Sequence, residues 1–343
     1  MDARALKRHL GRLLISKGHN PKSGRAKFFM SLRSIYYFFK PSPIKAFLYD
    51  QDKFYTTKWL NFEFCSACNL RCKWCTLDHQ KKVVMMSPPI LEKGLDELTG
   101  NRNFRLERID LHNGGEVLLH NDLKGMLEIV SSRRHYIHHR PLISLLTNAT
   151  LLTEEKAEVI VKSNSLDEIR FSVDGGTKEL FESIRIGAKW ESVKGNILKF
   201  VEVNNRSGKK VKTGIICMIP PEKELDVRWM SEDFKSLFSN IDHISLRYPH
   251  TFDGSKDLGL PRREQNTVEQ RMCYLLIGNL VILPNGETVV CCADLNSRGV
   301  IGNITQNTLE ELYFSSERLL MIEMFVKNRK KQISLCENCD GFY

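Results

Sequence analysis

Short apolar runs alternate with longer amphipathic stretches through the middle of the chain, which predicts strands followed by helices. The strands are expected in WLNFEF, RIDLH, LISLL, DEIRFSV, VKTGIICMI and HISLRY, between residues 59 and 248. Helical sequence follows the strands, as in PPILEKGLDELTG, which has proline in its first turn and glycine at its end. Another helix is expected near residues 226–239. Six such units predict an α/β protein, a partial (β/α)6 open barrel with its working face at the carboxyl ends of the strands.

The alternation stops near residue 250, where an exposed connection rich in Gly, Asp and charge begins. A β-hairpin is predicted next, because Asn285–Gly286 separates the apolar run LVIL from ETVV. The segment NTLEELYFSSERLLMIEMFV then predicts one amphipathic helix with an asparagine cap. The pattern therefore divides the chain into a core at 59–250 and a small C-terminal extension at 251–343.

A basic, aromatic-rich segment, residues 1–58, precedes the first strand, and AKFFMSLRSIYYFFK within it predicts a helix. The formal net charge of +10 belongs to this part, since residues 1–60 hold 13 Lys or Arg and 3 Asp or Glu. One interpretation is a helix packed on the main domain. The other is a docking element for an anionic surface or polyanion, such as acidic lipid or nucleic acid.

Composition indicates a cytoplasmic globular protein, with 42% hydrophobic and 27% charged residues over 343 positions. No apolar run reaches the length of a transmembrane segment, and MDARALKRHL does not resemble a secretory signal. Ten cysteines in a reducing compartment favour metal ligands over disulfides. Nine of them fall into an N-terminal and a C-terminal group, which predicts two metal sites. Cys217 stands alone and is interpreted as a core residue.

The N-terminal group is CNLRCKWC, in which Cys68, Cys72 and Cys75 have C-x3-C-x2-C spacing. Three thiolates on one loop hold three irons of a four-iron cluster and leave the fourth iron open for a ligand. The alternative is tetrahedral zinc, with Cys65 as the fourth thiolate. Zinc would not explain the polar groups that end the next strands, namely Gly114–Gly115–Glu116, Asn148, Ser172 and Asp174.

These motifs resemble the radical S-adenosylmethionine (radical SAM) superfamily, whose cysteine signature usually carries an aromatic residue where Trp74 stands. The resemblance implies a [4Fe-4S] cluster whose open iron binds S-adenosylmethionine through its amino and carboxylate groups. It also implies reductive cleavage to methionine and a 5′-deoxyadenosyl radical, which takes a hydrogen atom from the substrate.

The same resemblance implies roles for residues at the strand ends. Gly114, Gly115 and Glu116 would meet the amino group of S-adenosylmethionine, although Val117 replaces the usual proline. Ser172 would donate to the ligand's carboxylate, and Asp174 is expected to cap its turn. The remaining two assignments depart further from the pattern. Asn148 is followed by Ala149 in place of glycine, and Arg185 is interpreted either as a carboxylate partner or as one half of a surface salt bridge.

The C-terminal cysteines resemble the SPASM/twitch extension of some radical SAM enzymes, with Gly286 five residues before Cys291. The resemblance implies a second, auxiliary [4Fe-4S] cluster with four thiolate ligands: Cys273, Cys291, Cys336 and Cys339. Cys291 and Cys292 are expected to face opposite ways, so only one should ligate, and the spacing selects Cys291. Structural zinc is the alternative at this site.

The implied function is that of an oxidoreductase-type radical SAM enzyme, which oxidises the substrate radical through the auxiliary cluster. A sugar, polyol or related small molecule is the expected substrate, and a flavodoxin or ferredoxin the expected electron donor. Modification of a ribosomal peptide is the alternative, and a non-catalytic, metal-stabilised binding protein is the alternative of another class. The ending DGFY differs from the Gly-Gly tail of the molybdopterin-precursor cyclase, which argues against that activity.

A catalytic base or radical partner is expected at the mouth of the barrel. Four residues that end strands there are candidates: His112, Arg247, Tyr248 and His250.

Overall fold

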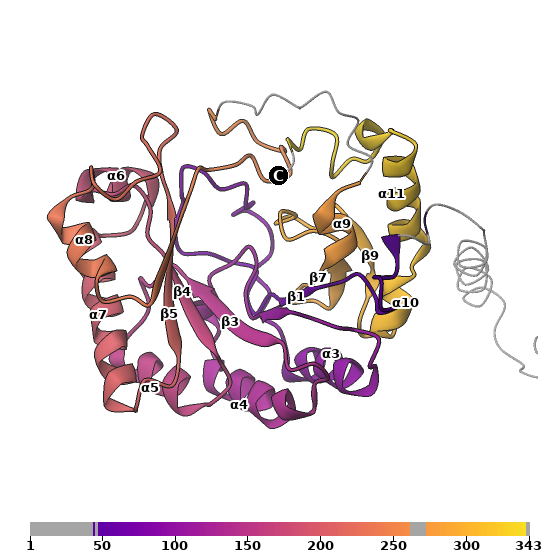
Figure 1. The fold of residues 1–343 in the computed structure, drawn as a ribbon, viewed down its shortest axis with the longest axis horizontal. Coiled ribbons are helices and arrows are strands. Elements are labelled where there is room, and N and C mark those ends of the chain that lie inside the picture. The colour runs from indigo at the N-terminus through magenta and orange to yellow at the C-terminus, as the bar shows by residue number, and fades with distance from the viewer. Residues whose placement is uncertain (1–43, 45–46, 261–271, 341–343) are drawn as a thin grey trace, which may run out of the picture.

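The computed structural model describes residue 44 and residues 47–260 and 272–340 (Figure 1). The helix expected in the basic N-terminal segment lies outside these residues. Of that segment, the structure describes the part just before the barrel, where Tyr55 stacks on Tyr313 with ring centroids 4.5 Å apart.

Nine strands form one sheet in the order β6-β5-β4-β3-β2-β1-β7-β8-β9. Neighbouring strands from β6 to β7 run parallel, and β8 and β9 are antiparallel additions. The strands are β1 Trp59–Phe62, β2 Arg108–Asp110, β3 Leu142–Thr147, β4 Glu168–Ser172, β5 Lys212–Met218, β6 His243–Arg247, β7 Asn279–Ile282, β8 Glu287–Val289 and β9 Val300–Asn303. The α/β class and the partial barrel are therefore confirmed.

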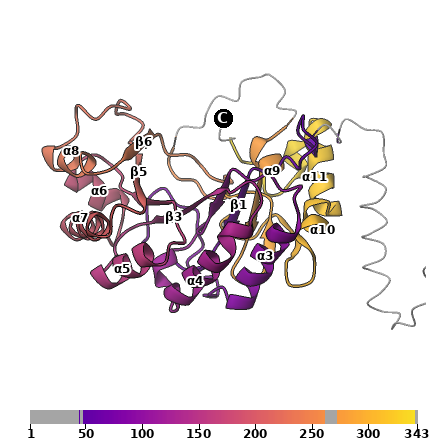
Figure 2. The same ribbon diagram turned by 60° about the horizontal axis from the view of Figure 1, so that its bottom comes forward.

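Helices α3, α4, α5, α7 and α8 follow one another along the outside of the curved sheet in Figures 1 and 2. The α-helices are α3 Pro88–Gly100, α4 Leu123–Arg133, α5 Glu154–Lys162, α6 Lys178–Ile184, α7 Trp190–Arg206, α8 Glu232–Phe238, α9 Tyr274–Gly278, α10 Leu309–Tyr313 and α11 Ser316–Val326. No helix in the described part of the chain is long and apolar enough to cross a membrane.

Local sequence explains where the barrel helices begin. Helix α3 has proline in its first turn, as expected from PPILEKGLDELTG. Thr153 accepts a hydrogen bond from the Lys156 amide and caps α5, which has two acidic residues in its first turn. The helices then bury apolar faces against the sheet. In that layer Trp190 of α7 stacks on Phe234 of α8 at 4.0 Å between ring centroids.

The expected hairpin after residue 278 forms as β7 and β8, with Val281 opposite Val289. Strand β7 also pairs in parallel with β1, which places Trp59 beside Asn279 and Phe62 beside Ile282. The C-terminal part of the chain therefore continues the barrel sheet beyond β1. This pairing places the end of β8 next to the barrel sheet.

Two helix predictions are wrong in extent. The single helix expected over NTLEELYFSSERLLMIEMFV is interrupted at Phe314, and it forms α10 and α11 instead. Thr308, not an asparagine, caps α10 in a capping box with Glu311, and Ser315 caps α11 by accepting from the Arg318 amide. The helix expected near 226–239 begins only at Glu232.

These two caps predict a measurable contribution to stability. Thr308→Ala and Ser315→Ala should each lower the free energy of unfolding by about 1 kcal/mol, because each leaves helix amides without an acceptor. Urea midpoints of the cluster-loaded protein would measure the loss. Thr308→Ser is the matched control and should retain most of the stability, since it keeps the hydroxyl. Equal losses in both Thr308 variants would contradict the assignment.

Candidate functional site

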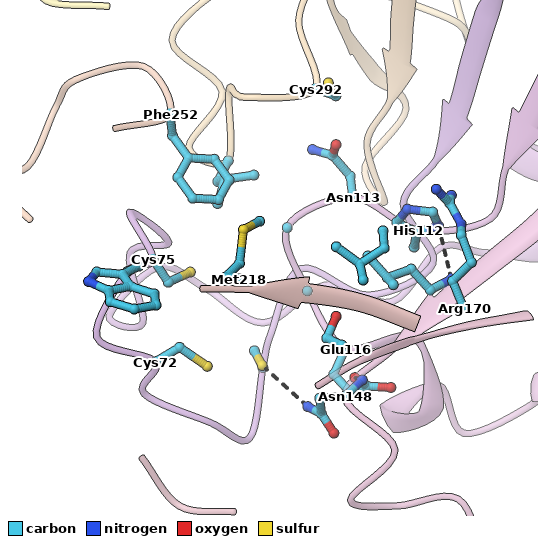
Figure 3. A pocket seen from close by; sticks show the side chains of 18 of the residues that line it. Cys72, Cys75, His112, Asn113, Glu116, Asn148, Arg170, Met218, Phe252 and Cys292 are labelled. Carbon is cyan, nitrogen blue, oxygen red and sulfur yellow. Dashed lines mark hydrogen bonds between the residues drawn. The ribbon is translucent and has the colours of Figure 1, made fainter. Parts of the chain in front are cut away.

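A cavity of about 350 Å³ lies at the carboxyl ends of the barrel strands. Residues from the loop after β1 and from the ends of β2, β3, β4 and β5 line it (Figure 3). All three cysteines of the C-x3-C-x2-C motif are among them. So are the six residues expected at the S-adenosylmethionine site: Gly114, Gly115, Glu116, Asn148, Ser172 and Arg185.

The cysteine loop lies directly on the turn that follows β2. The Glu116 amide donates to the Ala67 carbonyl at 2.8 Å. A Cβ atom on Gly115 would stand 1.9 Å from the Cys65 carbonyl oxygen, so only glycine fits this position. On its other side the loop is held by backbone bonds from Arg71 and Lys73 to the carbonyls of Ile186 and Ile184.

Glu116 connects the end of β2 to the end of β3 through hydrogen bonds of its carboxylate. Its Oε1 accepts from the Thr147 hydroxyl at 2.6 Å and from the Leu118 amide at 3.0 Å, and Oε2 accepts from the Asn148 amide at 2.8 Å. Burial raises the pKa of this carboxyl, and the hydrogen bonds from Asn148 and Thr147 oppose that rise. Three donors thus fix the carboxylate at the cavity wall, with lone-pair capacity left for one further donor.

Two side chains reach the sulfur atoms of the cysteine loop. Asn148 donates from Nδ2 to Cys68 Sγ at 3.8 Å, and the Arg185 guanidinium donates to Cys72 Sγ at 3.7 Å. Arg185 also pairs with Asp174 at 2.7 Å. The carboxylate is buried and the guanidinium is partly buried, so this ion pair does not lie on the open surface. These side chains donate hydrogen bonds to sulfur. Such bonds are one of the factors that set the reduction potential of an iron–sulfur cluster.

Asp174 joins two strands instead of capping its own turn. Its Oδ1 accepts from the Met218 amide at 2.8 Å, at the end of β5, and its Oδ2 accepts from Arg185. Ser172, two residues earlier at the end of β4, lines the cavity. Arg185 is thereby held over the cavity by a carboxylate that is itself fixed to the sheet.

The donor set of the cysteine loop fits a cluster better than a single ion. Burial raises the pKa of Cys68 to about 11 and also raises that of Cys72, so thiolates there need a nearby cation. Among the described residues, no group of three or more His, Cys, Asp and Glu is arranged around one metal ion. Cys65 is buried and its sulfur exchanges hydrogen bonds with the backbone of Ala67, away from the cavity lining. A tetrahedral zinc site with Cys65 is therefore not built here.

The inner part of the cavity is polar. It is formed by five side chains from β1, β2, β4, β7 and the residues after them: Asn61, Asp110, His112, Arg170 and Asn279. Arg170 pairs with Asp110 at 2.8 Å. Burial lowers the pKa of His112 to about 4, and its Nδ1 accepts from the Leu146 amide at 3.1 Å. His112 is therefore neutral near pH 7, with Nε2–H left as a donor.

Sequence reasoning missed most of these inner residues. A signal existed for two of them, since Asp110 and Arg170 are charged positions within two of the predicted barrel strands. Of the expected candidates at the barrel mouth, Arg247 and His250 line the cavity with His112. Tyr248 is not among the lining residues, and its hydroxyl donates to the Lys223 carbonyl at 3.1 Å.

The C-terminal cysteines gather around a second, smaller cavity. All four predicted ligands line it: Cys273, Cys291, Cys336 and Cys339. The rest of the wall is largely apolar, with Leu275, Val290 and Phe325 among its residues. Burial raises the pKa of Cys336 to about 12, so these thiols too would ionise only beside a cation. Four thiols in an apolar pocket fit a fully ligated iron–sulfur cluster.

Cys291 and Cys292 face different cavities. Cys291 lines the C-terminal cavity, whereas Cys292 lines the large cavity of the barrel. Both follow β8, which ends at Val289, so their divergence arises in the turn after the strand. The two cavities are thus separated by one step along the backbone.

Comparison with known proteins agrees with this geometry. Residues 62–233 match the model of the Radical SAM superfamily, and residues 273–340 match that of the SPASM iron-sulfur cluster-binding domain. Among curated proteins, the probable GTP 3′,8-cyclase of Methanococcus maripaludis strain C5 is 31% identical over 138 residues. That alignment covers 40% of this chain and 43% of the relative, so the chain spans less than half of the curated relatives it matches.

Solved structures share the fold at low sequence identity. BtrN in complex with AdoMet and 2-DOIA has a TM-score of 0.56 and 16% identity, covering 83% of this chain and 94% of BtrN. Streptococcus suis SuiB bound to precursor peptide SuiA has a TM-score of 0.59 and 16% identity, covering 84% and 72%. For anSMEcpe with bound AdoMet the TM-score is 0.51 with 19% identity, covering 82% and 85%.

The contact between Gly115 and the cysteine loop gives a direct test of how the first site is built. Gly115→Ala should displace the loop, because its Cβ would overlap the Cys65 carbonyl oxygen. Iron bound after anaerobic reconstitution should fall by about half, that is, by the four irons of one cluster. Gly100→Ala is the control, since a Cβ there meets nothing within 4 Å. Full iron content in Gly115→Ala would show that the loop does not depend on this contact.

Proposed function

Because the chain belongs to the radical SAM superfamily and carries a SPASM domain, we propose that it removes a hydrogen atom from a polar small molecule and then oxidises the resulting radical. Two parts of this statement follow from membership itself. The protein is a radical SAM enzyme, and its cofactors are a [4Fe-4S] cluster with S-adenosylmethionine and an auxiliary iron–sulfur cluster. The substrate, the oxidation and the individual ligands are the proposal.

Cys68, Cys72 and Cys75 would hold the first cluster, with Gly114, Gly115 and Glu116 facing the amino group of S-adenosylmethionine and Asn148, Ser172 and Arg185 completing its site. When bound, these cofactors supply a 5′-deoxyadenosyl radical that takes a hydrogen atom from carbon. The chain's own contribution is positional. Glu116 and Asp174 tie the strand ends together, so that the ligand-facing groups keep one arrangement.

The polar inner wall of the cavity is the observation that supports the proposed class of substrate. Asn61, Asp110, Arg170 and the His112 Nε2–H offer both donors and acceptors, and they are held by the sheet rather than by loops. Such a wall suits a molecule with several hydroxyl or amino groups, such as a sugar, polyol or aminocyclitol. Burying an apolar substrate against it would leave Arg170 Nε and Asn279 Oδ1, which have no hydrogen-bond partner among the described residues, unpaired at a cost of about 1–3 kcal/mol each.

The adjacent cavities support the oxidative step. Cys273, Cys291, Cys336 and Cys339 would hold the auxiliary cluster, and the residue after Cys291 already lines the reaction cavity. An electron leaving a substrate radical would therefore have an acceptor next to the cavity wall. A soluble one-electron protein of the flavodoxin or ferredoxin class would supply and collect electrons.

The cysteine assignments predict two separable losses. Anaerobically reconstituted wild type should bind about eight irons, and Cys68→Ala/Cys72→Ala/Cys75→Ala about four, with no cleavage of S-adenosylmethionine. Iron analysis and chromatography of 5′-deoxyadenosine would measure both. Cys273→Ala/Cys336→Ala should also lose about four irons, yet retain the first cluster. The assignments would be wrong if either variant kept its full iron content.

The substrate assignment predicts a specific effect of Arg170. A screen of sugars, aminocyclitols, peptides and GTP would identify compounds that raise 5′-deoxyadenosine formation. Arg170→Met should reduce that stimulation about 10–100-fold, because a charge-assisted hydrogen bond contributes roughly 1.5–3 kcal/mol. Arg108→Met is the matched control, because Arg108 pairs with Glu168 on the same strands but does not line the cavity. Stimulation by peptides alone would instead favour peptide modification.

A further inference from the structure

The thiol of Cys292 lies in the reaction cavity and outside the cysteine group of the second cavity. It is among the residues that line the barrel cavity, and it does not line the pocket of Cys273, Cys291, Cys336 and Cys339. In Figure 3 Cys292 is on the far side of the cavity from Cys72 and Cys75. A thiol that is not assigned as a cluster ligand therefore faces the space in which the substrate radical would form.

An independent feature marks this part of the cavity as a place for a ligand. Asn279 also lines the cavity and is only 1% exposed, yet its Oδ1 has no hydrogen-bond partner. Its Nδ2 is already used, donating to Asn61 Oδ1 at 2.9 Å. Buried acceptors are seldom left unpaired, so a donor group on a ligand is the expected partner. Asp110, whose charge acts on Cys292, lies in the same region.

Sulfur–hydrogen bonds are weaker than most carbon–hydrogen bonds, and the oxygen–hydrogen bonds of alcohols and the nitrogen–hydrogen bonds of amides are stronger than either. A carbon radical in this cavity would therefore take a hydrogen atom from Cys292 in preference to any other exchangeable hydrogen there. We propose that Cys292 is a hydrogen-atom donor, which returns a hydrogen to the substrate radical and gives the enzyme a redox-neutral reaction beside oxidation. This inference rests on the hydrogen abstraction of the proposed function, but not on its oxidative step.

The step balances without an oxidant. The carbon radical gains a hydrogen atom as a new C–H bond forms, and the S–H bond of Cys292 breaks to leave a sulfur radical. One electron from the flavodoxin- or ferredoxin-class donor and one proton from solvent then restore the thiol. Because Cys292 and the cysteine loop are on opposite sides of the cavity, the hydrogen would return to the face opposite the one from which it left. The product would be the substrate inverted at that carbon.

The test follows deuterium into the substrate. Cluster-loaded enzyme is incubated in D2O with S-adenosylmethionine, dithionite and a sugar or aminocyclitol that raises 5′-deoxyadenosine formation, and the recovered sugar or aminocyclitol is analysed by mass spectrometry. In wild type, the carbon radical should take deuterium from the exchanged Cys292 thiol. Cys292→Ser should lose that label, since the hydroxyl bond is too strong to give up its hydrogen. The readout is deuterium per molecule of product, so it does not depend on the rate of cleavage.

Two controls distinguish a role of the Cys292 thiol from a general effect of losing a thiol and from loss of a cluster. Cys217→Ala removes a buried thiol in β5 that does not line the cavity, and the label should be unchanged in this variant. Iron content should be equal in wild type and Cys292→Ser. A loss of about four irons in Cys292→Ser would make Cys292 a cluster ligand and overturn the inference. Unlabelled product in wild type, or equal label in Cys292→Ser, would also overturn it. Absence of any 5′-deoxyadenosine would refute the proposed function instead.

Discussion

The close contact between the cysteine loop and the turn after β2 is the constraint on which the rest of the site depends. Parallel pairing of β1 and β2 brings the two loops to one edge of the sheet, and the missing side chain at Gly115 lets their backbones touch. The Glu116 amide then bonds to Ala67, while its carboxylate bonds to the start of the loop after β3. A single residue thereby sets the positions of three loops, and Asn148 in the third of them reaches Cys68 in the first.

A second consequence follows from the pairing of β7 with β1. If the C-terminal hairpin packed elsewhere, its cysteines would form a remote site. Because it extends the sheet next to β1, Asn279 lies beside Asn61, and Cys292 and Leu295 after β8 line the barrel cavity. The extension is therefore part of the wall of the reaction cavity. This arrangement makes electron transfer between the two sites physically reasonable, since no long protein path separates them.

Sequence reasoning predicted the parts of this molecule that depend on local signals. Periodicity located the barrel strands, Asn285–Gly286 located the hairpin, and cysteine spacing located both sulfur groups. It could not locate the inner wall, because residues such as Asp110, Arg170 and Asn279 become neighbours only through strand order and register. The split between α10 and α11 was missed for a different reason. Apolar periodicity continues across Phe314, and only the caps at Thr308 and Ser315 end one helix and start the next.

The fate of a substrate radical in this cavity is a competition between electron loss and hydrogen gain. Electron loss needs an acceptor within tunnelling reach, and hydrogen gain needs a weak X–H bond in contact with the radical carbon. In the proposed assignment, the adjacent residues Cys291 and Cys292 would provide one element of each, because they line two different cavities. The orientation of the bound substrate would then decide the outcome. A radical carbon turned toward Cys292 is reduced on contact, whereas one held away from it, by hydrogen bonds to Arg170 and Asp110, persists long enough to be oxidised.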